Sequence, residues 1–156
     1  MKKLFLLLSI GLIAGFAFLS SCDNGNGEED LTEQQERAQM MSGTWTIQSA
    51  TVPQGVDPTI LNGSTMTFNT DAGHTPTSFS ASGMPDFFST QSNSGWAFSS
   101  SINVVVLSSV TPVAGFNINN VTANSMSISF SHPGLTAMAG GRIADLSGAY
   151  TANLTK

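Results

Sequence analysis

The sequence predicts an antiparallel all-β domain, a barrel or a sandwich, preceded by one short helix. The first observation is a period-two alternation over short segments, clearest in residues 125–131, where serine occupies every second position and the residues between are apolar. The second is that turn residues such as Asn62-Gly63 and His132-Pro133-Gly134 separate these segments. The third is that a helical pattern follows the leader only once, over residues 32–42. Many short strands with such turns are typical of barrels and sandwiches.

The helix is predicted from its ends. Thr32 followed three residues later by Gln35 is a capping-box pattern. Glu33 and Glu36 complement the positive end of the helix dipole, and Gly43 ends the helix. We therefore expect a single helix over residues 32–42 in the mature chain.

The strands are predicted from alternation and from the turns between them. In the first, Trp45 and Ile47 alternate with short polar residues. Residues 104–107 (Val-Val-Val-Leu) are apolar on both faces, so we expect a central strand or one covered outside by the helix or a loop. About eight strands are expected, over residues 44–49, 65–69, 77–81, 95–99, 102–107, 114–121, 125–131 and 146–154.

The first 21 residues read as a signal peptide. Lys2 and Lys3 begin it, and an almost unbroken apolar run follows over residues 4–19. This run is shorter than the roughly 20 residues of a membrane-spanning helix. Leu19-Ser20-Ser21-Cys22, which comes next, resembles a bacterial lipobox.

The lipobox resemblance implies a lipid anchor. In that family the cysteine becomes the new N-terminus, its thiol receives a diacylglyceryl group and its amine is acylated. Two or more chains make anchoring stable, because each buried methylene contributes about 0.8 kcal/mol and one chain alone is marginal. Cys22 is the only cysteine of the chain, so a disulfide framework and a thiolate metal cluster are excluded. The alternative is an ordinary signal peptide followed by an incidental cysteine.

An acidic tether is expected over residues 22–31. Residues 23–30 contain no apolar side chain, so we expect this stretch to be flexible. An acidic stretch behind a lipidated cysteine resembles a surface-export signal, whereas Asp23 in second position resembles an inner-membrane retention signal. The length of the run favours the outer membrane and leaves exposure at the cell surface open. Six of the ten acidic residues lie in or near this leader: Asp23, Glu28, Glu29, Asp30, Glu33 and Glu36.

Gly43-Thr44-Trp45, which follows the helix and opens the first strand, resembles the Gly-x-Trp start of lipocalins. The resemblance implies an up-and-down barrel over residues 43–156, with the helix at one end and Trp45 closing it. In that family a basic side chain from late in the sequence covers the tryptophan ring. Arg142, taken as the structural partner, and Lys156 are the candidates. An immunoglobulin-like sandwich is the alternative fold.

Composition excludes several functions. Five basic residues against ten acidic ones argue against nucleic acid as a partner. Only 10% of residues are charged, against about 25% in an average domain. His74 and His132 lie in turns without metal-ligand spacing, and no Gly-x-Ser-x-Gly motif occurs. We therefore expect no catalytic residues, metal or cofactor, although a Ser–His–Asp site around either histidine is the enzyme alternative.

Ligand binding is the more open possibility. Met84, Phe87 and Phe88 lie in a Gly- and Pro-marked segment, and two adjacent aromatic residues cannot both face inward on a strand. We therefore predict that these three residues and Trp96 contact a small apolar or amphipathic ligand at the barrel mouth. This hypothesis requires a cavity among Phe68, Phe87, Phe88, Phe98, Phe116 and Met126. The alternative is a sandwich that contacts envelope proteins or glycans and has a filled core with an exposed aromatic patch.

Overall fold

A computed structural model describes residues 30–138 and 142–156, without the side chains of 135–144. The chain divides into two units between Asp30 and Leu31, and the second is described here. The predicted signal peptide, Cys22 and most of the tether lie outside the described residues. The elements are α1 (Glu33–Met41), β1 (Gly43–Thr51), β2 (Thr65–Thr70), β3 (Pro76–Ser82), β4 (Phe88–Phe98), β5 (Val104–Pro112), β6 (Gly115–Val121), β7 (Ser125–His132), β8 (Leu135–Met138), β9 (Arg142–Asp145) and β10 (Gly148–Thr155).

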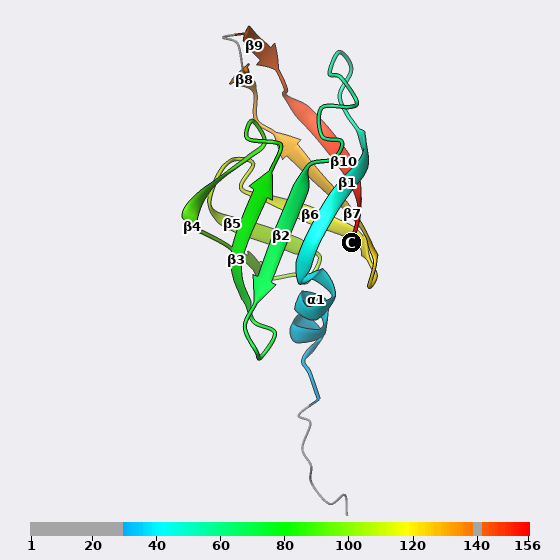
Figure 1. Ribbon diagram of the computed structural model, residues 1–156, viewed down its shortest axis with the longest axis vertical. Coiled ribbons are helices and arrows are strands. Elements are labelled where there is room, and N and C mark those ends of the chain that lie inside the picture. Colours follow the sequence, from blue (N-terminus) through cyan, green and yellow to red (C-terminus); the bar gives the residue numbers. More distant parts are fainter. Residues whose placement is uncertain (1–29, 139–141) are drawn as a thin grey trace, which may run out of the picture. The chain divides into compact units, whose positions relative to one another are not determined.

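Eight strands form a closed antiparallel barrel in the order β1-β10-β7-β6-β5-β4-β3-β2 (Figure 1). Strand β1 closes it, because Thr46 pairs with Thr65 of β2 on one side and with Thr155 of β10 on the other. Strands β8 and β9 form a separate two-stranded sheet between β7 and β10. The predicted all-β class and the barrel are confirmed, and the sandwich alternative is wrong, because a closed sheet has no second layer to pack on.

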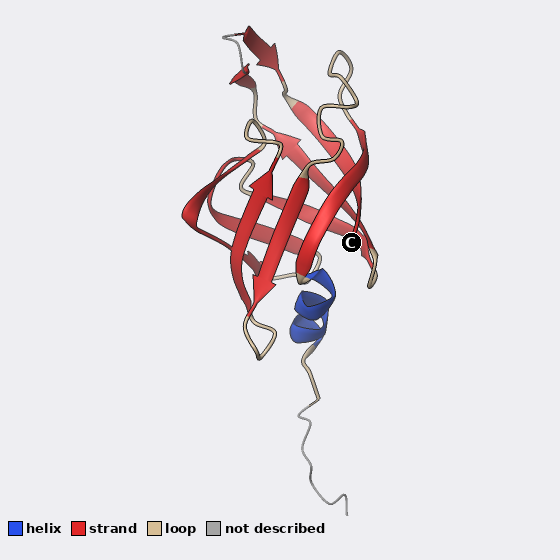
Figure 2. Ribbon diagram, in the orientation of Figure 1, coloured by secondary structure: helices blue, strands red, loops and turns tan. Residues whose placement is uncertain are grey.

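The helix forms where its capping residues predict. The Thr32 amide donates to the Gln35 side chain (2.8 Å), and the Gln35 amide donates to the Thr32 hydroxyl (3.3 Å). These two bonds satisfy amides that a helix start leaves without intrahelical partners. Ala38 and Met41 are fully buried, so α1 packs one face against the end of the barrel (Figure 2).

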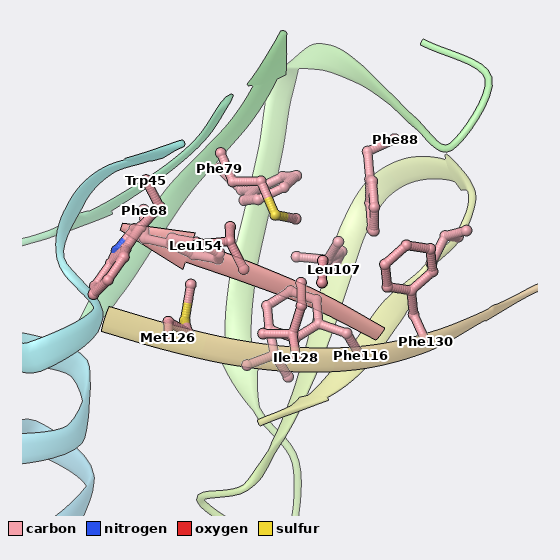
Figure 3. Close-up of a cluster of buried hydrophobic side chains, with 14 of the residues drawn as sticks. Trp45, Phe68, Phe79, Phe88, Leu107, Phe116, Met126, Ile128, Phe130 and Leu154 are labelled. Atoms are coloured by element: carbon pink, nitrogen blue, oxygen red, sulfur yellow. The ribbon is translucent and has the colours of Figure 1, made fainter. Parts of the chain in front are cut away.

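The barrel interior holds the apolar residues of the alternating strands. Phe68 packs against three rings, with its centroid 5.2 Å from Phe79, 5.3 Å from Trp96 and 5.9 Å from Phe116. Figure 3 shows Phe68, Phe79 and Phe116 among the buried side chains. Further along, Phe130 packs against Phe88 at 5.1 Å. Phe79 is tilted by 50° to Phe68, and the other three pairs are edge to face. Edge-to-face pairs contribute about 0.5–1.5 kcal/mol each beyond the burial of their area.

Four features differ from the sequence predictions. Strand β4 starts at Phe88, well before the expected residue 95, and β5 runs on to Pro112. The sequence pattern predicted no strands where β8 and β9 form a hairpin. The outer side of residues 104–107 is not covered, because Val106 is 47% exposed. A barrel wall has only one buried face, so an apolar run in it leaves an outward-facing side chain in water.

Candidate functional site

Lys156, and not Arg142, covers the tryptophan that closes the helix end of the barrel. The Lys156 Nζ lies 4.6 Å from the Trp45 ring centroid and donates to the Met40 carbonyl (2.8 Å). The Trp45 indole N–H donates to the Met41 carbonyl (2.6 Å). A Cβ at Gly43, whose φ is +113°, would lie 3.5 Å from the Lys156 Cε. The Gly-Thr-Trp motif thus joins the helix, the first strand and the C-terminal residue.

The register of β10 explains why Arg142 is not this partner. β10 begins at Gly148, opposite His132, and ends at Thr155, opposite Thr46 of β1. Eight residues of strand span about 25 Å. Arg142 lies in β9, before the start of β10, and therefore at the other end of the barrel. Burial of the Lys156 ammonium lowers its pKa below the usual lysine range.

The predicted ligand residues Met84, Phe87 and Phe88 are buried at the end of the barrel opposite α1. Each exposes 3% of its surface or less. The amides of Phe87 and Phe88 donate to the Met84 carbonyl, and the Val113 amide donates to the Phe87 carbonyl. Phe87 packs against Tyr150 with centroids 5.1 Å apart. The 83–88 segment thus folds its aromatic residues inward over the core.

Trp96, the fourth predicted ligand residue, faces the interior of the barrel from β4. It is 4% exposed, and its indole N–H donates to the Asn69 carbonyl (2.8 Å). Its ring meets Phe68 and Phe98 edge to face. Of the six residues expected to surround an internal cavity, all but Phe98 are buried, and Phe98 is partly buried against the same cluster. These side chains contact one another where the hypothesis places a ligand.

A groove of about 440 Å³ lies in the wall formed by β5, β6, β7 and β10. Val106, Asn117, Ser131 and Ala149 contribute exposed side chains to it. Buried residues of the same strands are also among its lining residues. The full lining is Val104, Val105, Val106, Gly115, Phe116, Asn117, Ser129, Phe130, Ser131, Ala149, Tyr150 and Thr151.

Strand pairing and side-chain size explain why the wall is hollow here. The paired residues Val106 and Gly115 lie on β5 and β6, and the paired residues Ser131 and Ala149 lie on β7 and β10. Pairing of β6 with β7 ends at Asn117 and Ser129, whereas β7 continues to His132 along β10. Gly115 has no side chain, and those of Ser131 and Ala149 are short. Strands β6 and β7 therefore leave an open space beside Val106.

The lining residues that the structure describes are uncharged. Its polar groups are the Asn117 amide and the hydroxyls of Ser129, Ser131 and Thr151, and its apolar groups include Val104 and Val106. The Ser129 hydroxyl donates to the Asn119 side-chain oxygen (3.1 Å), so only its oxygen is left to accept from a ligand. Tyr150 contributes no free hydroxyl, because its O–H donates to the Leu146 carbonyl (2.7 Å). Burial, followed by the charge of Asp145, raises the pKa of Tyr150 above its usual value. Such a lining can bind a neutral molecule with both apolar and hydrogen-bonding parts.

Sequence reasoning missed this groove, although two signals pointed to it. Val106 is an apolar residue on the outer face of a strand that we expected to be central or to be covered outside by the helix or a loop. The small residues Ser131 and Ala149, on two other strands, leave room around Val106. Only the cross-strand register places these residues next to each other.

The hydrogen bonds that the structure gives the two histidines go to main-chain groups. The His132 Nε2 bonds to the Asp86 main-chain carbonyl, and its Nδ1 accepts from the Gly134 amide. The His74 amide donates to the Asp71 carbonyl in a turn. Among the described residues, no group of three His, Cys, Asp or Glu side chains is placed to hold a metal ion.

Comparison with known proteins returned no match to a family model, a curated protein or a solved structure. Within the part of the chain that the structure describes, no helix has the length and apolar character needed to cross a membrane.

Proposed function

We propose that this chain is a bacterial lipoprotein, anchored in the outer membrane through lipid on Cys22, whose barrel binds a small neutral amphipathic molecule in the wall groove. The groove itself carries this proposal, because it joins exposed Val106 to the hydroxyls of Ser129 and Ser131 in an uncharged hollow. The lipobox-like sequence at Leu19-Ser20-Ser21-Cys22 supports the anchor. Catalysis is not part of the proposal.

The chemistry of the groove limits its ligand. Among the described side chains, no Lys, Arg, Asp or Glu lines it, so a phosphate or carboxylate would lose water without gaining a charged partner there. Apolar contact with Val104 and Val106 favours a short hydrocarbon part. The amide of Asn117 and the neighbouring hydroxyls favour an uncharged polar part, such as a glycoside or an alcohol.

The wall groove is preferred to the barrel interior because of the packing inside. Phe68, Phe116 and Trp96 already contact one another, and an internal ligand would have to separate these rings. Fully burying one aromatic side chain contributes roughly 1.5–3 kcal/mol, so displacing several would offset much of a small ligand's affinity.

The test is a fluorescence titration of the Cys22→Ser chain with 1-N-phenylnaphthylamine, a neutral apolar dye. We expect saturable binding that weakens about tenfold or more in Val106→Asp, because the new carboxylate must remain hydrated. Ser80→Asp is the matched control, because Ser80 is exposed on β3 outside the groove. Equal binding by both variants would place the dye elsewhere. If dye binding weakens in Ile128→Val and stays unchanged in Val106→Asp, the dye binds among the interior side chains.

A further inference from the structure

The wall groove lies where the pairing of two barrel strands stops. The last pair of β6 with β7 at this end is Asn117 with Ser129. The same register, continued by two residues, places Gly115 opposite Ser131, and no strand pair joins these two residues in the described barrel. Both residues line the groove. The groove thus occupies a place that an antiparallel ladder would otherwise fill.

The main-chain groups of Ser131 face this opening. Along an antiparallel strand, successive residues direct their N–H and C=O alternately to the two neighbouring strands. Two bonds beside the start of β7 set the alternation: the Thr122 amide donates to the Ser125 carbonyl (2.8 Å), and the Lys156 amide donates to the Asn124 carbonyl (3.3 Å). Odd-numbered residues of β7 therefore face β6, and even-numbered residues face β10. Unbroken pairing with β10 carries this alternation to Ser131.

Gly115 faces the same opening from the other side. The Ile118 amide donates to the Asn103 carbonyl (2.7 Å), and the Leu107 amide donates to the Ala114 carbonyl (2.8 Å). These bonds direct the even-numbered residues 114–118 toward β5, so the main-chain groups of Gly115 are directed toward β7. Two main chains, each with an N–H and a C=O, therefore face each other across the groove.

A secondary amide matches this arrangement. In a trans amide the N–H and the C=O point in opposite directions. An amide between the two main chains can therefore donate to the carbonyl of one and accept from the N–H of the other, as a residue inside a sheet does. A hydroxyl offers its donor and its acceptor from a single oxygen and so spans a shorter distance.

We infer that the groove binds a ligand with an uncharged secondary amide, such as the N-acetyl group of an amino-sugar glycoside, between the main chains of Gly115 and Ser131. This inference rests on the proposed function and narrows its class of ligand. A peptide strand fits less well, because β7 ends at His132, one residue beyond Ser131, and leaves few main-chain groups to pair with it.

Hydrogen exchange of the Cys22→Ser chain, corrected for intrinsic rates, tests the open ladder without a ligand. Phe130 is the neighbour of Ser131 on β7, but it faces β10, where its pair with Tyr150 is formed. We expect the Ser131 amide to exchange about 100-fold faster than the Phe130 amide. Equal rates would show that the Ser131 amide is bonded within the barrel and would overturn the inference.

Two amphiphiles that differ in one group test the class of ligand. Octyl N-acetyl-β-glucosaminide carries a secondary amide where octyl β-glucoside carries a hydroxyl. In amide NMR titrations below the micelle concentrations, we expect the acetylated compound to bind about tenfold more tightly, because it gains the two main-chain bonds. Equal affinities would overturn the amide preference and leave the proposed function standing. Binding of neither compound at the groove would overturn both.

Two variants at one position separate the main chain from the side chain. Ser131→Ala removes the hydroxyl and keeps the N–H, whereas Ser131→Pro removes the N–H and puts a ring carbon in its place. Proline is tolerated on a strand where its nitrogen faces an open edge, so Ser131→Pro should fold. We expect it to bind octyl N-acetyl-β-glucosaminide about tenfold more weakly than Ser131→Ala.

Equal binding by the Ser131→Pro and Ser131→Ala chains would overturn the inference. If the proline variant does not fold, the exchange rate of the Ser131 amide in the parent chain still decides whether the ladder is open.

Discussion

Lys156 illustrates how one residue can link three parts of the molecule. Its ammonium covers Trp45, bonds to the Met40 carbonyl at the end of α1 and follows directly after β10. The sequence supplied the tryptophan and two candidate cations. It could not choose between them, because the choice depends on which end of β10 meets the start of β1.

Replacing Lys156 by methionine should lower the free energy of unfolding by about 1 kcal/mol. The variant keeps an apolar stem and loses the cation–π contact and the bond to Met40, both in a partly exposed place where such contacts are weakened. Urea unfolding followed by tryptophan fluorescence measures this. Thr77→Met, at an exposed position of β3, is the control and should stay within about 0.5 kcal/mol of the parent chain. An unchanged unfolding free energy in Lys156→Met would contradict the assignment.

Tyr150→Phe should cost about 1 kcal/mol at pH 7, because the Leu146 carbonyl loses its donor while the stacked contact with Phe130 remains. The raised pKa of Tyr150 means that the folded chain holds this proton more tightly. Its contribution is therefore complete below the usual tyrosine pKa of about 10 and is lost as the pH rises through the folded value.

The parent chain should consequently lose more stability between pH 9 and pH 11 than Tyr150→Phe loses. Urea midpoints at these two pH values measure the difference. The lowered pKa of Lys156 acts in both chains and cancels in the comparison. Parallel losses in the two proteins would show that the Tyr150 hydroxyl is not the responsible group.

Elements were predicted well where one signal dominates. Alternation located β7, and the capping pattern located α1. The early part of β4 was missed, because its residues (Ser, Thr, Gln, Ser, Asn) carry no apolar alternation. Only Ser89 and Thr90 of this stretch pair with β5, before a register shift that ends at Gly95. The β8–β9 hairpin was missed because glycines and small residues weaken its pattern. The covering of Val106 was mispredicted, because sequence alone does not show where a small residue leaves the wall open.

The close approach of the paired strands β5 and β6 beside the groove requires glycine at position 115. A Cβ there would lie 2.5 Å from the Val105 carbonyl oxygen, and backbone atoms cannot move away cheaply. We expect Gly115→Ala to lower the unfolding free energy by about 2 kcal/mol or more. Gly134→Ala is the matched control, because its Cβ would meet no atom within 4 Å. Equal melting temperatures of the Gly115→Ala and Gly134→Ala variants would contradict this account of how β5 and β6 pack.

At the scale of the whole molecule, an aromatic-filled barrel follows a sequence that resembles a lipoprotein leader. The fold class followed from the sequence because period-two patterns and turns report it locally. The groove did not, because it is made by residues of four strands that only the closed register brings together.

The anchor is tested by phase separation in Triton X-114. Protein extracted from its native membrane should partition into the detergent phase, and Cys22→Ser should move to the aqueous phase once its leader is removed, because the lipid chains provide the apolar surface. The mass of the N-terminal peptide should exceed that of the bare cysteine by the added lipid. Detergent partitioning by the leader-free Cys22→Ser chain would contradict lipid anchoring.

The position of the ligand is tested most directly by amide NMR of the Cys22→Ser chain titrated with octyl glucoside, a neutral amphiphile, below its micelle concentration. The account predicts saturable shifts confined to the amides of Val106, Gly115, Ser131 and Ala149, with Ile128 and Leu154 unchanged. Shifts centred on those two inward-facing residues, or no saturable shift at the groove, would contradict it.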